Sequence, residues 1–306
     1  MVAELGPDAH TRAVARLKIL GPDDEPQLLE FLHQRIEHSM FLLSNLRAAG
    51  WEDHGHPYNG SYVAAFADGR IVGVACHYRR GNVVVNAPDH AVELARAALE
   101  ASGRPLKAVV GPALEVQAVA AALALPVGDA AQLDESEGLY RLELADLQVP
   151  APLRDGTVRG RELAAADLDL VDAWMIRYRV ESAGDPDTPE LRRAIRNDHE
   201  AALGRGEVWV LEHAGQLVAR TGFNARLPEA VQIGGVWTPH ELRGRGYARA
   251  ALAAHLLAIR ETGVSTAILF TGESNTPARR AYAALGFRRV GDYGLLLLRA
   301  PIRPLG

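Results

Sequence analysis

The residues best suited to chemistry lie in one glycine-rich stretch, GGVWTPHELRGRGYA, from Gly234 to Ala248. A strand-like run precedes this stretch and a helix-like run follows it. A glycine-rich turn at a helix N-terminus binds anions, because the free N–H groups of the first turn and the helix dipole both favour negative charge. Gly244 and Gly246 lack the Cβ atoms that would hold a phosphate away from the backbone. Three arginines add charged hydrogen-bond donors: Arg243, Arg245 and Arg249.

Two common phosphate-binding motifs do not fit this stretch. A Walker loop ends in Gly-Lys-Ser/Thr, and no lysine occurs here. A dinucleotide fingerprint needs Gly-x-Gly-x-x-Gly, but Arg249 occupies the position of the third glycine. The pattern that remains is Arg-x-x-Gly-x-Ala over residues 243–248.

That pattern resembles the acyl-CoA pyrophosphate loop, Gln/Arg-x-x-Gly-x-Gly/Ala, of the GNAT N-acetyltransferase superfamily. Further along the chain, LFTGESNTPARRAYAALGF contains a series that is similar to a second superfamily signature: Asn275, Tyr282 and Gly286-Phe287. The resemblance extends over roughly residues 157–300.

The resemblance implies which residues bind acetyl-CoA as the acyl-donor cosubstrate. In this superfamily the third and fourth strands of the core splay apart, and the pantetheine arm fills the gap. Backbone groups of Val236, Trp237 and Thr238 are expected to contact pantetheine, with one N–H polarising the thioester carbonyl. Asn275 is expected to contact pantetheine or the neighbouring loop. The pyrophosphate would be held by Arg243, Gly244, Arg245, Gly246, Tyr247 and Ala248. No metal is implied.

Tyr282 is the expected general acid, since the departing CoA thiolate needs a proton that a phenol can supply. The alternative is that Tyr282 only packs against Leu285 and Phe287. The general base stays unassigned, because residues 231–237 contain no carboxylate or histidine. Four residues elsewhere are alternatives for this base: Glu181, His199, Glu229 and Glu273.

The acceptor pocket is expected to involve residues 174–190, because relatives build this pocket from the first helix and the loop after it. Trp174, Tyr178 and Glu181 are spaced to share one helix face and are the predicted acceptor-binding residues. A helix with a solvated polar side is the alternative. The acidic loop at 182–189 is a candidate lid over a cationic amine.

A linker at residues 146–156, with Pro150, Pro152 and Gly156, predicts a domain boundary. The sequence at 62–75 is similar to that at 208–221, so we expect two copies of one unit. The predicted domains are residues 1–149, degenerate and GNAT-like, and residues 156–306, catalytic. The first copy has Asn86-Ala-Pro-Asp-His-Ala-Val92 in place of the phosphate loop and is expected not to bind CoA.

Hydrophobic periodicity predicts a matching order of elements in each half. In the first half, helices are expected at 22–50 (with a break), 88–102 and 115–124, and strands at 61–67, 70–78, 82–86, 106–110 and 139–144. In the second half, a helix is expected at 167–180, and a second helix follows a polar loop and ends at about residue 203. Two further helices are expected at 247–261 and 277–285. The strands there are 207–212, 216–224, 230–236 and 266–270, followed by a strand pair within 287–299.

Composition excludes several classes of protein. A hydrophobic fraction of 48% over 306 residues excludes a largely disordered protein. No apolar run long enough for a membrane span occurs, and the N-terminus has no signal-peptide core, so a cytoplasmic protein is expected. The single cysteine, Cys76, cannot form an internal disulfide. The fragment Asp53-His54-Gly55-His56 is interpreted as a solvated loop rather than a metal site.

The charge distribution favours a small anionic ligand over nucleic acid. The chain has a net charge of −5, but residues 240–306 carry ten arginines and four acids, or +6. We therefore expect no nucleic-acid or membrane partner.

The N-terminal half could shape the acceptor site, form a homodimer or cover a sheet edge.

Together these features predict an α/β (α+β) protein of two GNAT-like domains. Each domain is expected to be a mixed, mostly antiparallel sheet flanked by helices, with a splayed central strand pair in the C-terminal domain. The expected activity is transfer of an acetyl group from acetyl-CoA to a primary amine of a small molecule or peptide, by direct attack in a ternary complex. The alternative is a non-catalytic acyl-CoA-binding sensor or scaffold.

Overall fold

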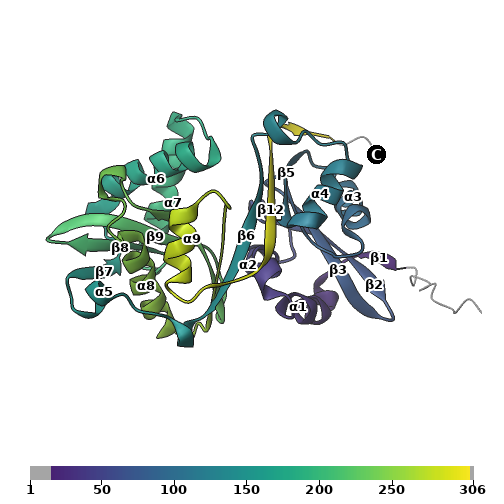
Figure 1. Cartoon of the computed structure of the whole chain (residues 1–306). Helices are drawn as coiled ribbons and strands as arrows, with labels where there is room; N and C mark the ends of the chain where they lie inside the picture. Colours follow the sequence, from purple (N-terminus) through teal and green to yellow (C-terminus); the bar gives the residue numbers. More distant parts are fainter. Residues whose placement is uncertain (1–14, 304–306) are drawn as a thin grey trace, which may run out of the picture.

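The computed structural model describes residues 15–303, so residues 1–14, examined above as a potential signal peptide, lie outside it. The described residues form one mixed twelve-stranded sheet in the order β1-β2-β3-β4-β5-β12-β6-β11-β10-β9-β8-β7, with helices on both faces (Figure 1). Two neighbouring pairs are parallel, β4 with β5 and β10 with β11, and the other pairs are antiparallel. The predicted mixed α/β fold is confirmed.

The first half of the chain supplies six strands and four α-helices within the described residues. Its strands are β1 (Arg16–Ile19), β2 (Gly60–Ala67), β3 (Arg70–Tyr78), β4 (Asn82–Asn86), β5 (Leu106–Pro112) and β6 (Leu133–Glu143). Its helices are α1 (Glu25–His33), α2 (Ile36–Ala49), α3 (Ala91–Ser102) and α4 (Ala113–Ala122). The break that was predicted within residues 22–50 separates α1 from α2.

The second half follows the same order of strands and helices. Its strands are β7 (Val158–Glu162), β8 (Val208–His213), β9 (Gln216–Arg226), β10 (Ala230–Trp237), β11 (Thr266–Thr271) and β12 (Arg288–Ile302). Its helices are α5 (Ala151–Arg154), α6 (Leu168–Ala183), α7 (Pro189–Ala202), α8 (Tyr247–Arg260) and α9 (Thr276–Ala283). The α7 helix begins at Pro189, and Thr188 is its N-cap residue. The Thr188 hydroxyl accepts a hydrogen bond from the Leu191 N–H.

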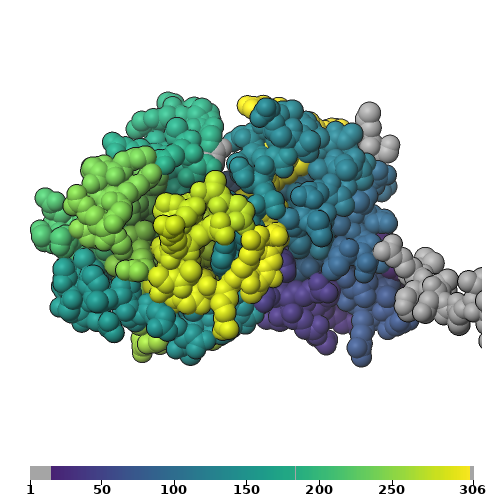
Figure 2. Space-filling model, viewed as in Figure 1, coloured from purple at the N-terminus to yellow at the C-terminus, as the bar shows by residue number. Residues whose placement is uncertain are grey.

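The two halves exchange strands at the centre of the sheet. The strand β12 lies between β5 and β6, and β6 lies between β12 and β11 (Figure 1). In the space-filling view, the yellow C-terminal segment accordingly lies against both the green half and the blue half (Figure 2). The sheet is therefore continuous across the linker, and the domain limits 1–149 and 156–306 stay a prediction.

The strand pair predicted within residues 287–299 is wrong, because β12 is one long strand. Its glycines do not form a turn. Gly291 lies at a register shift against β6, where the strand bends without reversing. A Cβ on Gly294 would lie 2.9 Å from the Cβ of Val116, so this glycine lets α4 pack closely on β12.

Alternate residues of the central strands face two different sets of helices. On one face, Leu139, Ile268 and Tyr293 belong to the same core cluster as residues of α1 and α2. On the other face, Tyr140 and Leu269 pack with residues of α8 and α9. Both clusters draw on strands from both halves of the chain, so the core crosses the linker as the sheet does.

The strands β10 and β11 separate after a short parallel pairing, as predicted. Their pairing ends at Gln232 and Ile268, although both strands continue. The strand β10 stays paired with β9 as far as Trp237 and contains a bulge at Gly235, whose φ of +58° is left-handed. A gap thus opens between β10 and β11 toward their C-terminal ends.

Within residues 15–303, no helix is long and apolar enough to cross a membrane.

We predict that Leu139→Ala destabilises both halves together. Leu139 is fully buried on β6, next to Phe270 of β11 and Gly291 of β12. The cavity should lower the free energy of unfolding by about 2–5 kcal/mol. Denaturant unfolding followed by circular dichroism should show one transition at a lower midpoint.

Leu114→Ala is the control, because Leu114 is 80% exposed and its loss should cost less than about 0.5 kcal/mol. Two separate transitions, with only one shifted by Leu139→Ala, would contradict a core shared between the halves.

Candidate active site

The glycine-rich stretch forms an anion-binding loop at the N-terminus of α8. Gly244 and Gly246 have φ angles of +77° and +78°, in the left-handed region that favours glycine. The first hydrogen bond of the helix runs from the Ala250 N–H to the Gly246 carbonyl. Within the described residues, the N–H groups of 244–249 have no hydrogen-bond partner. These free donors at a helix N-terminus fit a pyrophosphate.

Arg243 connects this loop to the end of β10. Its Nε donates to the Thr238 carbonyl at 3.1 Å, and its guanidinium lies 4.7 Å from the centre of the Trp237 ring. The neighbouring Arg245 donates to the Glu241 carbonyl. The buried Nε of Arg249 has no hydrogen-bond partner among the described residues. The loop thus carries cationic groups beside its free N–H donors.

Glu181, from the end of α6, reaches the phosphate loop. Its carboxylate lies 3.2 Å from the Arg243 Nη2 and 2.9 Å from the His240 Nε2. Partial burial raises the pKa of Glu181, but hydrogen bonds from His240 and Arg243 outweigh it and hold that pKa below its usual value. Glu181 is therefore an anion at the mouth of an anion site. Its predicted role in acceptor binding stays a prediction.

The other two predicted acceptor-binding residues, Trp174 and Tyr178, are more buried than Glu181. Trp174 is 5% exposed and packs in a cluster with Val208 and Val210 of β8. Tyr178 packs edge-to-face on Trp237, with ring centres 6.2 Å apart. Burial raises the pKa of the Tyr178 hydroxyl, and the Gly235 backbone at the bulge of β10 is among the groups that partly offset this rise. Of the two, Tyr178 is the one that reaches the gap.

The end of β10 contains polar atoms without partners. Trp237 and Thr238 are buried, yet the Trp237 Nε1 and the Thr238 Oγ1 have no hydrogen-bond partner among the described residues. Val236, between the bulge and Trp237, is half-buried. Buried polar groups normally have partners. These atoms, next to an open strand edge, fit a ligand with amide and carbonyl groups.

Tyr282 lies on α9, near enough to Tyr178 and Glu137 for both to affect its pKa. Its ring packs edge-to-face on Phe287, with centres 5.9 Å apart, so the packing role considered above is also real. Burial, with smaller contributions from Tyr178 and Glu137, raises the pKa of the Tyr282 hydroxyl. The hydroxyl therefore keeps its proton at neutral pH.

Asn275 is the N-cap residue of α9. Its Oδ1 accepts a hydrogen bond from the Ala278 N–H at 3.3 Å, and the residue is exposed. This bond orients the helix that carries Tyr282. Contact of Asn275 with pantetheine stays a prediction.

The four alternatives for the general base are all engaged with charged neighbours. Their partners are Arg243 and His240 for Glu181, Asp172 for His199, His33 for Glu229, and Arg279 and Arg289 for Glu273. Each of these carboxylates or imidazoles is therefore already part of an ion pair or hydrogen bond.

Two residues at the gap were missed in the sequence. Glu137 lies on β6, outside the predicted catalytic domain. Arg220 lies on β9 and is 2% exposed; burial lowers its pKa to about 10, and its Nη1 contacts the sulfur of Met175. A Cβ on Gly235 would lie 2.6 Å from that Nη1, so Arg220 packs under the bulge. The sequence did contain a signal for Arg220, because an arginine within the mostly apolar run LVARTG indicates a buried charge. The sequence around Glu137 contains no such signal.

The corresponding region of the first half is filled by the protein. Between β4 and β5, the Glu115 carboxylate accepts a hydrogen bond from the Ala87 N–H at 2.6 Å. A Cβ on Gly111 would lie 2.4 Å from the Val85 carbonyl oxygen, so β5 passes very close to β4. That the first half does not bind CoA stays a prediction.

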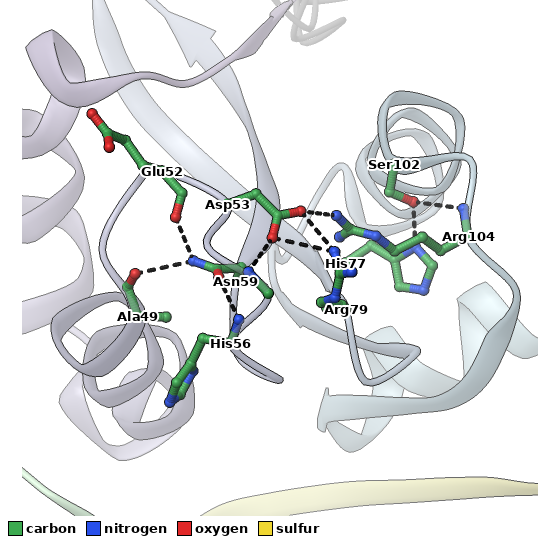
Figure 3. A network of polar contacts seen from close by, with 10 residues as sticks. Ala49, Glu52, Asp53, His56, Asn59, His77, Arg79, Ser102 and Arg104 are labelled. Carbon is green, nitrogen blue, oxygen red and sulfur yellow. Dashed lines mark hydrogen bonds and ion pairs between the residues drawn. The ribbon is translucent and has the colours of Figure 1, made fainter.

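The Asp53–His56 fragment is part of a surface ion-pair network (Figure 3). The Asp53 carboxylate lies 3.1 Å from the Arg79 Nη1 and 2.8 Å from the Arg104 Nη2. The described residues contain no group of three or more histidine, cysteine or acidic side chains that could hold a metal ion. The fragment therefore fixes a loop on the N-terminal half.

Comparisons with known proteins agree with this geometry. Residues 169–287 match the model of the acetyltransferase (GNAT) family, and no curated protein matches the chain. A tandem GNAT protein from the clavulanic acid biosynthesis pathway aligns over 95% of this chain and 100% of its own, with 17% identity and a TM-score of 0.55. A Drosophila protein aligns over 92% and 98%, with 16% identity and a TM-score of 0.60. A GCN5-related N-acetyltransferase from Sphaerobacter thermophilus aligns over 95% and 96%, with 16% identity and a TM-score of 0.54.

Residues 169–287 are therefore similar to a GNAT acetyltransferase domain. The fold over nearly the whole chain is that of a tandem GNAT protein.

We predict that Glu181→Gln tightens binding of CoA. The carboxylate competes with the pyrophosphate for Arg243, and an exposed ion pair contributes about 0.2–1 kcal/mol. The dissociation constant, measured by calorimetry, should fall about two- to five-fold.

Glu241→Gln is the matched control, because it removes the same charge from a residue just before the phosphate loop that makes no ion pair within residues 15–303. Binding that is unchanged or weaker in Glu181→Gln would show that Glu181 does not compete with the ligand.

Proposed function

We propose that the protein transfers an acetyl group from acetyl-CoA to a primary amine of a small molecule or peptide. The family of residues 169–287 indicates acyl transfer in general. The donor and acceptor are inferred from one observation: the gap beyond Gln232 and Ile268 leads directly to a loop with six free N–H groups, and Tyr282 reaches the same gap.

The residues around the gap fit an acyl-CoA. The pyrophosphate would bind the free N–H groups of 244–249 together with the arginines of the loop. The amide groups of the pantetheine arm would pair with the open edge of β10 near Val236, Trp237 and Thr238, where two buried polar atoms lack partners. When bound, acetyl-CoA supplies an activated acyl carbon in its thioester.

The acceptor amine would attack this carbon directly. A covalent acyl-cysteine route needs an accessible thiolate, and Cys76 is fully buried on β3 of the first half. Burial also raises the pKa of its thiol well above the usual value, so the reactive thiolate is disfavoured. Tyr282 would then protonate the departing sulfur.

We predict one acetyl-CoA site per chain, abolished by the double substitution Arg243→Ala, Gly246→Glu. The change removes a charged donor and places a carboxylate among the free N–H groups. Loss of two charge-assisted interactions should weaken binding at least about 100-fold in calorimetric titrations. Circular dichroism should confirm that the variant is folded.

Arg96→Ala is the control, because it removes an arginine from α3, the counterpart of α8 in the first half. Two sites per chain would show that the first half also binds. Absence of binding to the unaltered protein would overturn the proposed function.

We predict that Tyr282→Phe reduces turnover while leaving acetyl-CoA affinity within about two-fold of the original. Loss of a general acid typically costs about 10²–10⁴-fold in rate. Free CoA release with an amine acceptor would report turnover, and calorimetry would report affinity.

Tyr140→Phe is the control, since Tyr140 belongs to the same core cluster and its hydroxyl accepts a hydrogen bond from Arg279. Equal turnover in Tyr282→Phe would remove Tyr282 from the mechanism.

A further inference from the structure

We infer that Glu137, on the strand that the first half of the chain contributes to the centre of the sheet, is the general base that deprotonates the acceptor amine. This inference rests on the proposed function. It assigns a catalytic residue to a part of the chain outside the matched family region.

The register of the sheet places Glu137 at the open end of the gap. Gly138 of β6 pairs with Thr271, the last residue of β11. Gly272 follows directly, and a Cβ on Gly272 would lie 3.9 Å from the Glu137 Oε1. The parallel pairing of β11 with β10 has already ended at Ile268. The carboxylate therefore lies beside the part of β11 that has separated from β10.

Strand alternation sets the direction of the Glu137 side chain. Glu137 and Leu139 point to one face of β6, and Gly138 and Tyr140 to the other. Tyr140 packs in the cluster of α8 and α9, whereas Leu139 packs on the opposite face. Glu137 therefore approaches the gap from the face opposite the helix that carries Tyr282. A base and an acid on opposite sides of the reacting carbon suit transfer from one bound group to another.

Two tyrosines converge on the same place as Glu137. The Glu137 carboxylate contributes to the raised pKa values of both Tyr178 and Tyr282, and Tyr178 also raises that of Tyr282. The Tyr178 ring packs edge-to-face on Trp237 at the end of β10, with ring centres 6.2 Å apart. Three elements, β6, α6 and α9, thus bring one carboxyl and two hydroxyl groups around the gap.

Glu137 is also free to accept a proton. Among the described residues, it makes no hydrogen bond and no ion pair with its side chain, and it is half-buried. Each of the four carboxylates or imidazoles considered from the sequence is instead paired with an ionisable side chain. A base must take up a proton in each turnover, which an ion pair opposes.

The surroundings of Glu137 suit proton uptake near neutral pH. Burial, and then the neighbouring Glu135 on the same strand, raises the pKa of Glu137 to about 7. The other titratable groups that face it are the hydroxyls of Tyr178 from α6 and Tyr282 from α9, and Tyr293 of β12 is its register partner. All three are neutral at this pH.

The proton balance of the reaction closes with these groups. Glu137 takes one proton from the acceptor ammonium, which frees the nitrogen lone pair. The nitrogen attacks the thioester carbon, so a C–N bond forms and the C–S bond breaks. Tyr282 gives its proton to the departing sulfur, and the second proton lost by the nitrogen restores the Tyr282 hydroxyl. The products are the amide, free CoA and protonated Glu137, which then releases its proton to solvent.

Glu137→Gln tests this assignment, with Glu135→Gln as the control on the same strand. Turnover would be measured from pH 5.5 to 9 as free CoA release, with acetyl-CoA and the best acceptor from a panel of aliphatic primary amines and peptides. For the unaltered protein, kcat/KM should rise with pH through an inflection near pH 7, because the base must be deprotonated. Glu137→Gln should lose this inflection and about 10²–10³-fold of the rate at pH 7, with unchanged acetyl-CoA affinity.

Glu135→Gln should keep its activity and move the inflection to lower pH, since it removes the neighbouring charge that raises the pKa of Glu137. Glu137→Asp should recover part of the rate. An unchanged pH profile and rate in Glu137→Gln, with transfer by the unaltered protein, would overturn this inference alone. Acetyl-CoA binding without transfer to any amine of the panel would overturn both the inference and the proposed function.

Discussion

The structure depends on one constraint in β10: this strand must keep its hydrogen bonds to β9 while it leaves β11. The bulge at Gly235 makes this possible, because it lets β10 bend yet still pair Trp237 with Arg220. One edge of β10 is then open in a largely buried region. Backbone polar groups in such a position need partners. The open edge of β10 follows from that separation.

The exchange of β6 and β12 explains why the second half needs the first. Without β6, the edge of β11 beside the gap would have no partner strand, and Glu137 would be absent. The first half repeats the fold but not the site, since Glu115 occupies the region beside β4 and the glycine-rich loop is missing. The two halves therefore differ: the glycine-rich loop belongs to the second half, and the first half supplies the central strand β6.

Much of this arrangement is local and could be predicted from the sequence. The loop before α8 depends on glycines and arginines close together in the chain, and the strands and helices follow hydrophobic periodicity. The exchanged strands could not be predicted, because Gly291 is equally compatible with a turn and with a bulge, and only the partner strands decide between them. For the same reason Glu137 was missed: its importance comes from pairing with β11, more than 120 residues later in the chain. Glu181 was found, but its contact with Arg243 was not.

We propose that the gap between β10 and β11 and the loop before α8 together form one acyl-CoA site. Amide hydrogen exchange with and without acetyl-CoA tests it most directly, because it reads backbone N–H groups along the whole chain. We expect slower exchange at residues 234–238 and 244–249 on binding, with no change at residues 82–92. Protection at residues 82–92, or binding without protection at the C-terminal segments, would contradict it.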